Sequence, residues 1–469
     1  MLGLFNTLNL GARALQANQL GVEVTGQNLA NSSNAAYSRQ RVTLSTSTPT
    51  PTNLGMQGTG VQATSIQQVR DAMLDGEMRD ESSVGGYWSS QQSALEDAQA
   101  QLGEFLNLSA TGSASDSKGL SDQLNNLFNA FQSLATSPSS ITQRQNVINQ
   151  AQSLAAGLNQ ASQQLSGLNG DLNTSVGNNV TAANQLLSQI ADLNNQIVKA
   201  TAAGGTANDL NDTREQALEN LAKLTNIQTT TNANGTVDVS IGGTQLISGN
   251  PSQTLDTLQA YDSGNGQLLV RTATGGTPLT LSGGSIQGTI DARDGALQTL
   301  RSHLDTLASS LISQVNGIYS GGYDLNGGTG ASFFTGTDAA TIGVNSSLAT
   351  DPSRLQAAGV SGATGDNTVA LALAKLGQQS IAGLGNNTFS GAFASQVGSF
   401  GFAVSNANAE VNNHNSVATM LQNQRDSVSG VSIEEEVANL ITFQQAYSAS
   451  SKIISTVDQM LQTVVNLKT

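Results

Sequence analysis

Apolar residues recur at every seventh position near both ends of the chain. The positions are Leu8, Leu15, Val22 and Leu29 at the start, and Ile433, Leu440, Tyr447, Ile454 and Leu461 at the end. A seven-residue repeat keeps one seam of a helix turned toward a partner helix. One such stripe alone is more often the buried face of an ordinary amphipathic helix. Two matching stripes predict that the N- and C-terminal helices pair with each other as a coiled coil.

Each terminal stripe is narrow, and the remaining faces of both helices are polar. The C-terminal helix is expected to run for roughly 35 residues, which is about 50 Å. An isolated pair of such helices buries little apolar surface. We therefore expect both ends to be mobile in the monomer and to become ordered when neighbouring molecules complete the seam.

The first half of the interior has helical periodicity. Predicted helices cover residues 65–108, with a doubtful point at Gly85-Gly86, then 120–136, 141–168, a segment through Leu186 and Ile197, and 210–224. Ser137-Pro138 ends the second of these, and Gly204-Gly205 follows the fourth. The stretch 112–119 is predicted to be a loop.

The period changes to that of a strand at Ile227. Val237, Val239 and Ile241 alternate with polar residues, and Asn234-Gly235 before them is a hairpin signal. Glycine pairs suggest further short strands up to Ile290. Helix returns over 297–318, the Gly-rich stretch 321–391 is mixed, and a helix through Phe402 runs to a break at Ser429-Gly430.

This order predicts a mainly α fold with a small β insert, in which the N- and C-terminal halves pair along an elongated multi-domain rod of discontinuous domains. The predicted terminal coiled-coil domain comprises residues 1–60 and 430–469. A helical rod domain comprises 61–226 and 292–429, and the small β region comprises 227–291.

Composition narrows the classes of partner. Only 11% of the 469 residues are charged and the formal net charge is -15, so the surface is covered mainly by uncharged polar side chains, which suits packing against copies of the same chain. The 18 Lys and Arg residues are spread along the chain, which argues against nucleic acid and anionic membranes as partners.

Cysteine is absent. The start has no basic region of a secretory signal, and no apolar run approaches the ~20 residues of a membrane helix, so we expect either a cytosolic protein or export without a cleaved signal.

The residues that usually carry catalysis or bind metals are sparse. The two histidines, His303 and His414, lie in helical stretches and are read as ordinary surface or interface residues. Asp324-Leu325-Asn326-Gly327 faintly resembles a calcium loop but is interpreted as a turn. The three carboxylates Glu434 to Glu436 follow Ser432 and favour a helix N-terminus. We therefore predict no catalytic, cofactor or metal site, and no enzyme.

Two terminal motifs carry a family resemblance. The first, from Ala14-Leu15-Gln16-Ala17 through Asn28-Leu29-Ala30-Asn31-Ser32-Ser33-Asn34-Ala35-Ala36-Tyr37-Ser38-Arg39-Gln40-Arg41-Val42, resembles the N-terminal signature of bacterial flagellar axial proteins: the rod, hook and hook-associated proteins. The second, from Glu435 to Tyr447 and including Leu440 and Phe443-Gln444-Gln445, is similar to the C-terminal signature of the hook-associated protein 1 (FlgK) family. The two motifs cover about a sixth of the chain. Ala36 stands where a Gly is common, and Thr442 where a basic residue is common. The first replacement is expected to alter the turn before Tyr37, and the second to alter one subunit contact.

The resemblance implies a structural subunit of the hook–filament junction. It implies a ring of copies whose partners are hook protein, hook-associated protein 3 and a cytosolic export chaperone on the C-terminal helix. It also implies type III export without a cleaved signal and an extracellular location. The assembly interface implied by stripes and motifs consists of Leu8, Leu15, Val22, Leu29, Asn28, Asn31, Tyr37, Arg39, Gln40, Ile433, Leu440, Phe443, Tyr447, Ile454 and Leu461.

Three alternatives remain at this level. Another axial protein, such as hook-associated protein 3 or a distal rod protein, shares the terminal signatures in part. A secreted cell-wall hydrolase needs a carboxylate pair in a cleft, and the 4% aromatic content offers no sugar platform. A self-associating adhesin normally carries a secretion signal or a membrane anchor.

Overall fold

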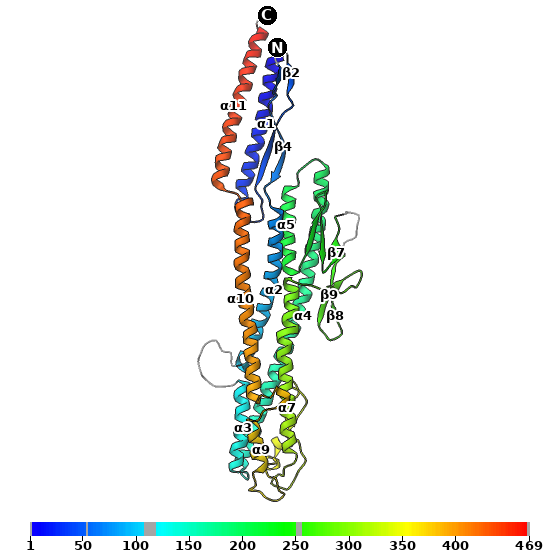
Figure 1. Cartoon of the computed structure of the whole chain (residues 1–469), viewed down its shortest axis with the longest axis vertical. Coiled ribbons are helices and arrows are strands. Elements are labelled where there is room, and N and C mark those ends of the chain that lie inside the picture. Colours follow the sequence, from blue (N-terminus) through cyan, green and yellow to red (C-terminus); the bar gives the residue numbers. More distant parts are fainter. Residues whose placement is uncertain (1, 53–54, 107–118, 250–255, 467–469) are drawn as a thin grey trace.

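The chain forms one long rod with both termini at the same end (Figure 1). The computed structural model describes residues 2–52, 55–106, 119–249 and 256–466. At the terminal end, α1 (Leu2–Ala30) lies beside α11 (Ile433–Asn466). The predicted pairing of the first and last helices is confirmed, and so is the mainly helical, elongated fold with small sheets.

Four long helices run along the rod below the terminal pair. They are α2 (Ala72–Leu106), α4 (Ile141–Ala202), α7 (Gln298–Tyr319) and α10 (Phe389–Ser429). Shorter helices pack against them: α3 (Leu120–Thr136), α5 (Asn208–Leu224), α6 (Gly284–Ala292), α8 (Ser346–Thr350) and α9 (Thr368–Leu376). A π-helical turn (Arg293–Leu297) joins α6 to α7, and two 3-10 turns cover Pro352–Arg354 and Ala382–Leu384.

The strands form small antiparallel sheets. A ribbon of β1 (Gln40–Thr46) and β4 (Val61–Gln68) lies against α1 and extends into β2 (Thr50–Thr52) and β3 (Gly55–Gln57). The β insert on the side of the rod contains β5 (Gln228–Thr231), β6 (Val237–Ile241), β7 (Thr244–Ile247), β8 (Leu258–Asp262) and β9 (Leu268–Thr272). Near the other tip, β10 (Phe334–Thr335) pairs with β11 (Gly343–Val344).

The interior is divided into two apolar clusters along the rod. The cluster nearer the free tip contains Phe131, Phe333 and Phe389 together with leucines of α3, α4 and α7. The second cluster joins the upper half of α4 to α5, α6 and the strands of the β insert, with Val239 and Ile241 fully buried. Helix α4 contributes a continuous row of side chains to both clusters.

Several boundaries differ from the sequence-based expectation. The helices expected over 141–168 and through Ile197 are one helix, α4, because the buried row continues through Leu172 and Val176 despite the glycines between them. Helix α2 begins at Ala72 rather than near Ser65, since 61–68 is strand β4. It continues through Gly85-Gly86, where Gly86 lets the Lys223 carbonyl of α5 approach closely.

The β insert also ends earlier than its sequence suggested. Strand structure stops at Thr272, and Gly284 to Ala292 is helix α6 rather than a strand. The predicted loop 112–119 falls almost wholly outside the described residues. Among the helices of the described ranges, none is long and apolar enough to cross a membrane.

Candidate functional site

The two terminal helices pair antiparallel along a seam with coiled-coil spacing. On α11 the buried and half-buried positions are Glu436, Leu440, Phe443, Ala446, Ser450, Ile454, Val457 and Leu461, in steps of three and four. Gly11 of α1 lies against Ile454, and Gly21 lies against the ring of Phe443. A side chain at either glycine would push the helices apart, so the close approach depends on these two small residues.

The predicted stripe of α1 lies beside this seam rather than at its centre. All four residues of the stripe, Leu8, Leu15, Val22 and Leu29, are half-buried. The last three directly follow Ala14, Gly21 and Asn28, which face α11 more closely. The buried face of α1 is made instead of small and polar residues: Gly11, Ala17, Gly21, Val24, Thr25 and Asn28. Sequence reasoning missed this face because it looked for large apolar side chains, although the seven-residue spacing of Ala14, Gly21 and Asn28 was visible.

The predicted positions of α11 are divided between the seam and the surface. Leu440, Phe443, Ile454 and Leu461 are half-buried at the seam. Tyr447 is 38% exposed and Ile433 is 55% exposed at the beginning of the helix. The helix therefore presents part of its apolar surface to solvent.

Asn28 is the polar centre of the terminal part. It is 1% exposed, and its Nδ2 donates to the Gln40 carbonyl (2.8 Å) and to Glu436 Oε2 (2.9 Å). Its Oδ1 accepts from Gln40 N (3.0 Å) and Tyr37 Oη (2.8 Å). One side chain thus joins α1, the loop after it, β1 and the start of α11. These contacts lie within the chain, whereas the sequence placed Asn28 in the assembly interface.

The neighbouring charges complete this arrangement. Arg39 donates to Glu436 Oε1 (2.9 Å) and pairs with Glu435 Oε2 (2.8 Å). Burial, together with the carboxylates Asp209, Asp212 and Glu436, raises the pKa of Tyr37, so its hydroxyl stays protonated and donates to Asn28. Asn31 bonds locally: its amide nitrogens meet the Gln27 carbonyl at 3.0 Å and 3.1 Å at the end of α1.

The same loop fastens the terminal part to the rod. Asp212 of α5 accepts from the Ser38 backbone N–H (3.0 Å) and hydroxyl (2.8 Å), and Arg70 approaches it at 3.5 Å. Gln40 Nε2 donates to Asp209 Oδ1 (2.8 Å). Burial raises the pKa of Asp212, and the Ser38 hydrogen bonds and Arg70 oppose that rise. We call this set, Asn28, Tyr37 to Gln40, Arg70, Asp209, Asp212 and Glu436, the joint.

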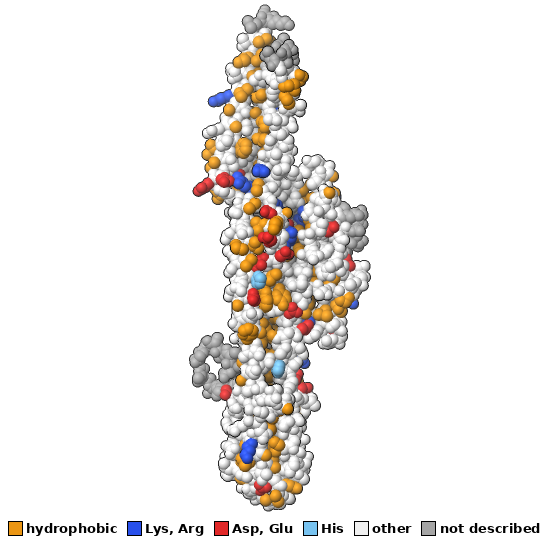
Figure 2. Space-filling model, viewed as in Figure 1, with side chains coloured by type: hydrophobic (Ala, Val, Ile, Leu, Met, Phe, Trp, Pro, Cys, Tyr) orange, Lys and Arg blue, Asp and Glu red, His pale blue; other side chains and the backbone are white. Residues whose placement is uncertain are grey.

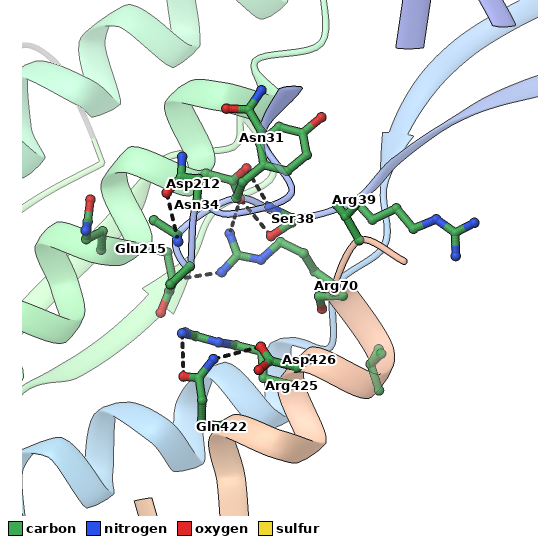
Figure 3. A pocket seen from close by; sticks show the side chains of 18 of the residues that line it. Asn31, Asn34, Ser38, Arg39, Arg70, Asp212, Glu215, Gln422, Arg425 and Asp426 are labelled. Carbon is green, nitrogen blue, oxygen red and sulfur yellow. Dashed lines mark hydrogen bonds and ion pairs between the residues drawn. The ribbon is translucent and has the colours of Figure 1, made fainter. Parts of the chain in front are cut away.

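A polar cleft of about 720 Å³ opens beside the joint (Figure 3). Its walls are the loop 31–39, one face of α5 and the end of α10 with the segment 429–432. Arg70, Arg425 and Lys223 face Glu215, Glu219 and Asp426 there, and Arg425 is held by Glu219 and Gln422. The charges are mixed and largely paired, which favours a water-filled gap between two parts of the molecule.

The sequence motifs considered for other chemistry have structural contacts. His414 Nδ1 lies 2.8 Å from Glu81 Oε1 and links α10 to α2. Asp324 accepts from the backbone of Asn326 and Gly328, as expected of a turn. Ser432 Oγ accepts from Glu435 N as a cap, but Glu436 is buried in the joint, which the sequence did not reveal. The described residues contain no group of three or more His, Asp or Glu placed to hold a metal ion.

Comparisons with known proteins agree with this architecture. A family described as the flagellar hook-associated protein FlgK helical domain matches residues 108–334, and the flagellar basal body rod FlgEFG C-terminal family matches 419–467. Flagellar hook-associated protein 1 of Bacillus subtilis (strain 168) is 27% identical over 513 residues, covering 99% of this chain and 99% of that protein. The chain is similar over nearly its full length to flagellar hook-associated protein 1.

Two further relatives extend this result. Flagellar hook-associated protein 1 of Escherichia coli (strain K12) is 23% identical over 554 residues, covering 98% of this chain and 99% of the relative. The solved flagellar hook junction protein FlgK from Burkholderia pseudomallei shares the fold, with a TM-score of 0.63, 19% identity, and coverage of 75% of this chain and 100% of that one. Members of the hook-associated protein 1 family are structural proteins of the flagellum and not enzymes.

The seam and the joint both lie in the terminal part of the rod, which also carries the two sequence motifs. The polar groups of the N-terminal motif, from Asn28 to Gln40, form hydrogen bonds within the chain, to Glu436 and to α5. Exposed apolar side chains flank the seam on both sides of α11: Val437 (39% exposed) and Ile441 (49%) on one side, and Ile453 (41%) and Met460 (50%) on the other. Figure 2 shows hydrophobic side chains at the surface along this terminal end of the rod.

Proposed function

We propose that this chain is a subunit of the junction between flagellar hook and filament, and that it assembles through its terminal helices. The proposal rests on one observation: α11 packs against α1 on one side and exposes apolar side chains elsewhere. One face is completed by α1, while the two exposed flanks, which together we call the outer face, carry Val437 and Ile441 on one side and Ile453 and Met460 on the other. Burying a large aliphatic side chain is worth roughly 1.5–3 kcal/mol, so contact with neighbouring copies gains stability from this face.

The predicted interface residues take different parts in this proposal. Ile433 and Tyr447, together with the half-buried stripe Leu8, Leu15, Val22 and Leu29, are proposed to meet neighbouring subunits. Leu440, Phe443, Ile454 and Leu461 hold the seam that presents the outer face. Asn28, Asn31, Tyr37, Arg39 and Gln40 are proposed to act indirectly, by fixing the loop that follows α1.

The finer features of the function are also proposals. The partners proposed are copies of the chain in a ring, hook protein on one side, hook-associated protein 3 on the other, and a cytosolic export chaperone on the C-terminal helix. Export through the flagellar type III apparatus, without a cleaved signal, is proposed with them. We further propose that the terminal assembly domain is 1–60 with 430–469, that the helical rod domain is 61–226 with 292–429, and that 227–291 is a small β region.

Complementation of a deletion strain of the source bacterium tests the function. Cells without the gene are expected to build hooks, to lack filaments and to shed flagellin into the medium. The variant Ile441→Asp should fold with unchanged helicity and melting temperature, because the side chain is 49% exposed, yet fail to restore filaments. The matched variant Gln445→Asp, which adds the same charge at an exposed position of the same helix, should restore them.

Each alternative gives a different result in this experiment. Deletion cells that lack hooks altogether would support a rod protein instead of a junction protein. Normal filaments on deletion cells would exclude the junction role. Filaments restored equally by both variants would show that the outer face of α11 is not the assembly surface.

A further inference from the structure

One polar side chain interrupts the apolar row of α10. In the half of α10 that packs against the tip-side cluster, the buried positions are Phe389, Phe393, Gln396, Phe400, Val404 and Ala407, in steps of three and four. Gln396 is 9% exposed and has apolar residues before and after it in this row. Helical spacing favours an apolar residue at such a position, so the amide needs a separate explanation.

The amide of Gln396 forms no hydrogen bond with another described residue. Asn194, in the buried row of α4, is different, because its Nδ2 donates to the Val237 carbonyl (2.8 Å) and its Oδ1 accepts from Arg214 Nη1 (3.0 Å). Burying an amide without a partner disfavours folding. The amide of Gln396 therefore indicates a molecule that supplies the missing partners.

Gln396 lines a pocket of about 320 Å³ between α7 and α10, two helices that pack against each other in the half of the rod toward the free tip (Figure 1). Helix α7 contributes the buried side chains of Leu300, Leu304 and Leu307, and α10 contributes Phe393. All four belong to the tip-side cluster. The pocket thus opens at the edge of an apolar core, with one unpaired amide in its wall.

The segment 383–387 forms the third wall of the pocket. Its base is closed by backbone hydrogen bonds: Ile381 N donates to the Asn387 carbonyl (3.0 Å), and Asn386 N donates to the Ile381 carbonyl (3.0 Å). Core packing on two sides and backbone hydrogen bonds on the third define the shape of the pocket. Pockets that bind small molecules are usually largely preformed in this way.

The surroundings of the pocket favour a small molecule over a second protein chain. Its rim carries the exposed polar residues Ser302, His303, Thr306 and Ser395. None of the large apolar side chains that are exposed in the described ranges lines it. A protein partner needs contact over a much wider surface with an apolar centre, whereas a small molecule buries most of its surface inside the pocket.

We propose that the pocket binds a small, mainly apolar molecule that carries one carboxamide group. The amide of Gln396 donates to the carbonyl of the ligand and accepts from its N–H, while the leucines and Phe393 contact the apolar part. An apolar cavity of about 150 Å³ holds a benzene ring, so this pocket has room for two fused rings and a short polar group. The proposal does not depend on the junction role.

Equilibrium dialysis of the full chain tests the pocket with two probes that share an apolar part. Naphthalene-1-acetamide carries the amide, and 1-methylnaphthalene lacks it. We expect the acetamide to bind with a dissociation constant of roughly 1 mM or tighter, as for other ligands of about 14 non-hydrogen atoms.

The variant Gln396→Leu keeps a side chain of similar size and removes the amide. It should weaken binding of the acetamide about five- to thirtyfold, because one or two hydrogen bonds are lost. Binding of 1-methylnaphthalene should be unchanged or tighter, because the wall becomes more apolar. A purely structural role of Gln396 would instead change the binding of both probes alike. Circular dichroism melting checks that the variant is folded.

A second variant fills the pocket without touching the amide. Ala392→Leu enlarges a half-buried side chain of the wall and should weaken both probes about tenfold or more. The matched control, Ala394→Leu, makes the same change at an exposed position of α10 outside the pocket and should bind like the parent.

The proposal is overturned if the parent chain does not bind the acetamide. It is also overturned if Gln396→Leu affects both probes equally or affects neither. Equal effects of Ala392→Leu and Ala394→Leu would show that the probes bind elsewhere on the chain, which also contradicts the proposal.

Discussion

Removing the Asn28 side chain is expected to release the terminal helices from each other and from β1. Asn28→Ala deletes four hydrogen bonds at once: two to the Gln40 backbone, one from Tyr37 and one to Glu436. Each is worth about 1 kcal/mol net, and the partners left behind are buried. Arg39 still satisfies part of Glu436. We expect a loss of about 3–5 kcal/mol in the free energy of opening.

Amide hydrogen exchange measures this loss where it occurs. A change of about 4 kcal/mol corresponds to roughly a thousandfold faster exchange of α1 and α11 amides. Helix α3, in the tip-side cluster, serves as the internal reference and should be unchanged. Asn9→Ala, at an exposed position of α1, is the matched control and should behave like the parent.

The isosteric variant Asn28→Asp separates the hydrogen bonds from the volume of the side chain. It keeps an acceptor for Gln40 and Tyr37 but places a second carboxylate against Glu436, so at neutral pH it should open at least as readily as Asn28→Ala. Below about pH 5 a proton shared by the two carboxyls restores a donor, and protection should partly return. If Asn28→Ala protects α1 and α11 within threefold of the parent, the reasoning about the joint is wrong.

Two further predictions concern the joint and the rod. Burial raises the pKa of Asp212, so the carboxyl binds its proton more tightly in the folded joint than in the unfolded chain. The stability that Asp212 contributes is therefore present in acid, and it declines as pH rises from about 3.8 through the raised pKa. Urea unfolding of Asp212→Asn should lack this decline. The free energy of unfolding of the variant should therefore increase relative to that of the parent as pH rises. Gly86→Ala should cost roughly 1–3 kcal/mol in urea unfolding, because the new methyl group meets the Lys223 carbonyl. The adjacent Gly85→Ala, with open space around it, should be neutral or stabilising by up to about 1 kcal/mol; equal effects of the two substitutions would contradict the close α2–α5 contact.

Elements with a single clear period could be predicted from the sequence. Helix α3 ends where Ser137-Pro138 indicated, and α7 follows the leucine spacing from Leu300 to Leu311. The ribbon β1–β4 was missed because its strands are rich in Thr, Ser and Gln and have no clear apolar alternation. The length of α4 was underestimated because its apolar positions were followed only to Leu168 and again from Leu186, whereas the buried row continues between them through Leu172 and Val176.

The candidate site was predictable in outline but not in its contacts. Terminal pairing followed from the seven-residue spacing, whereas the ion pairs of Arg39 with Glu435 and Glu436 did not. The partners of Asn28 and Ser38 lie 408 and 174 residues away in sequence, at Glu436 and Asp212. No local pattern encodes such contacts, because they depend on how distant helices come together in the folded chain.

The placement of polar and apolar contacts explains how α11 can be fixed in position while its exposed apolar side chains remain free to contact another molecule. The seam between α1 and α11 rests on glycines and modest apolar contacts, while its lower end is fixed by the directional hydrogen bonds of Asn28 and Glu436. Directional bonds define the position of α11 without covering its outer face with other side chains. An apolar fastening of equal strength would need bulk around α11 and would bury Val437 and Ile441. A buried polar joint therefore allows the helix to be positioned by its own chain while its exposed apolar side chains stay free to pack against another molecule.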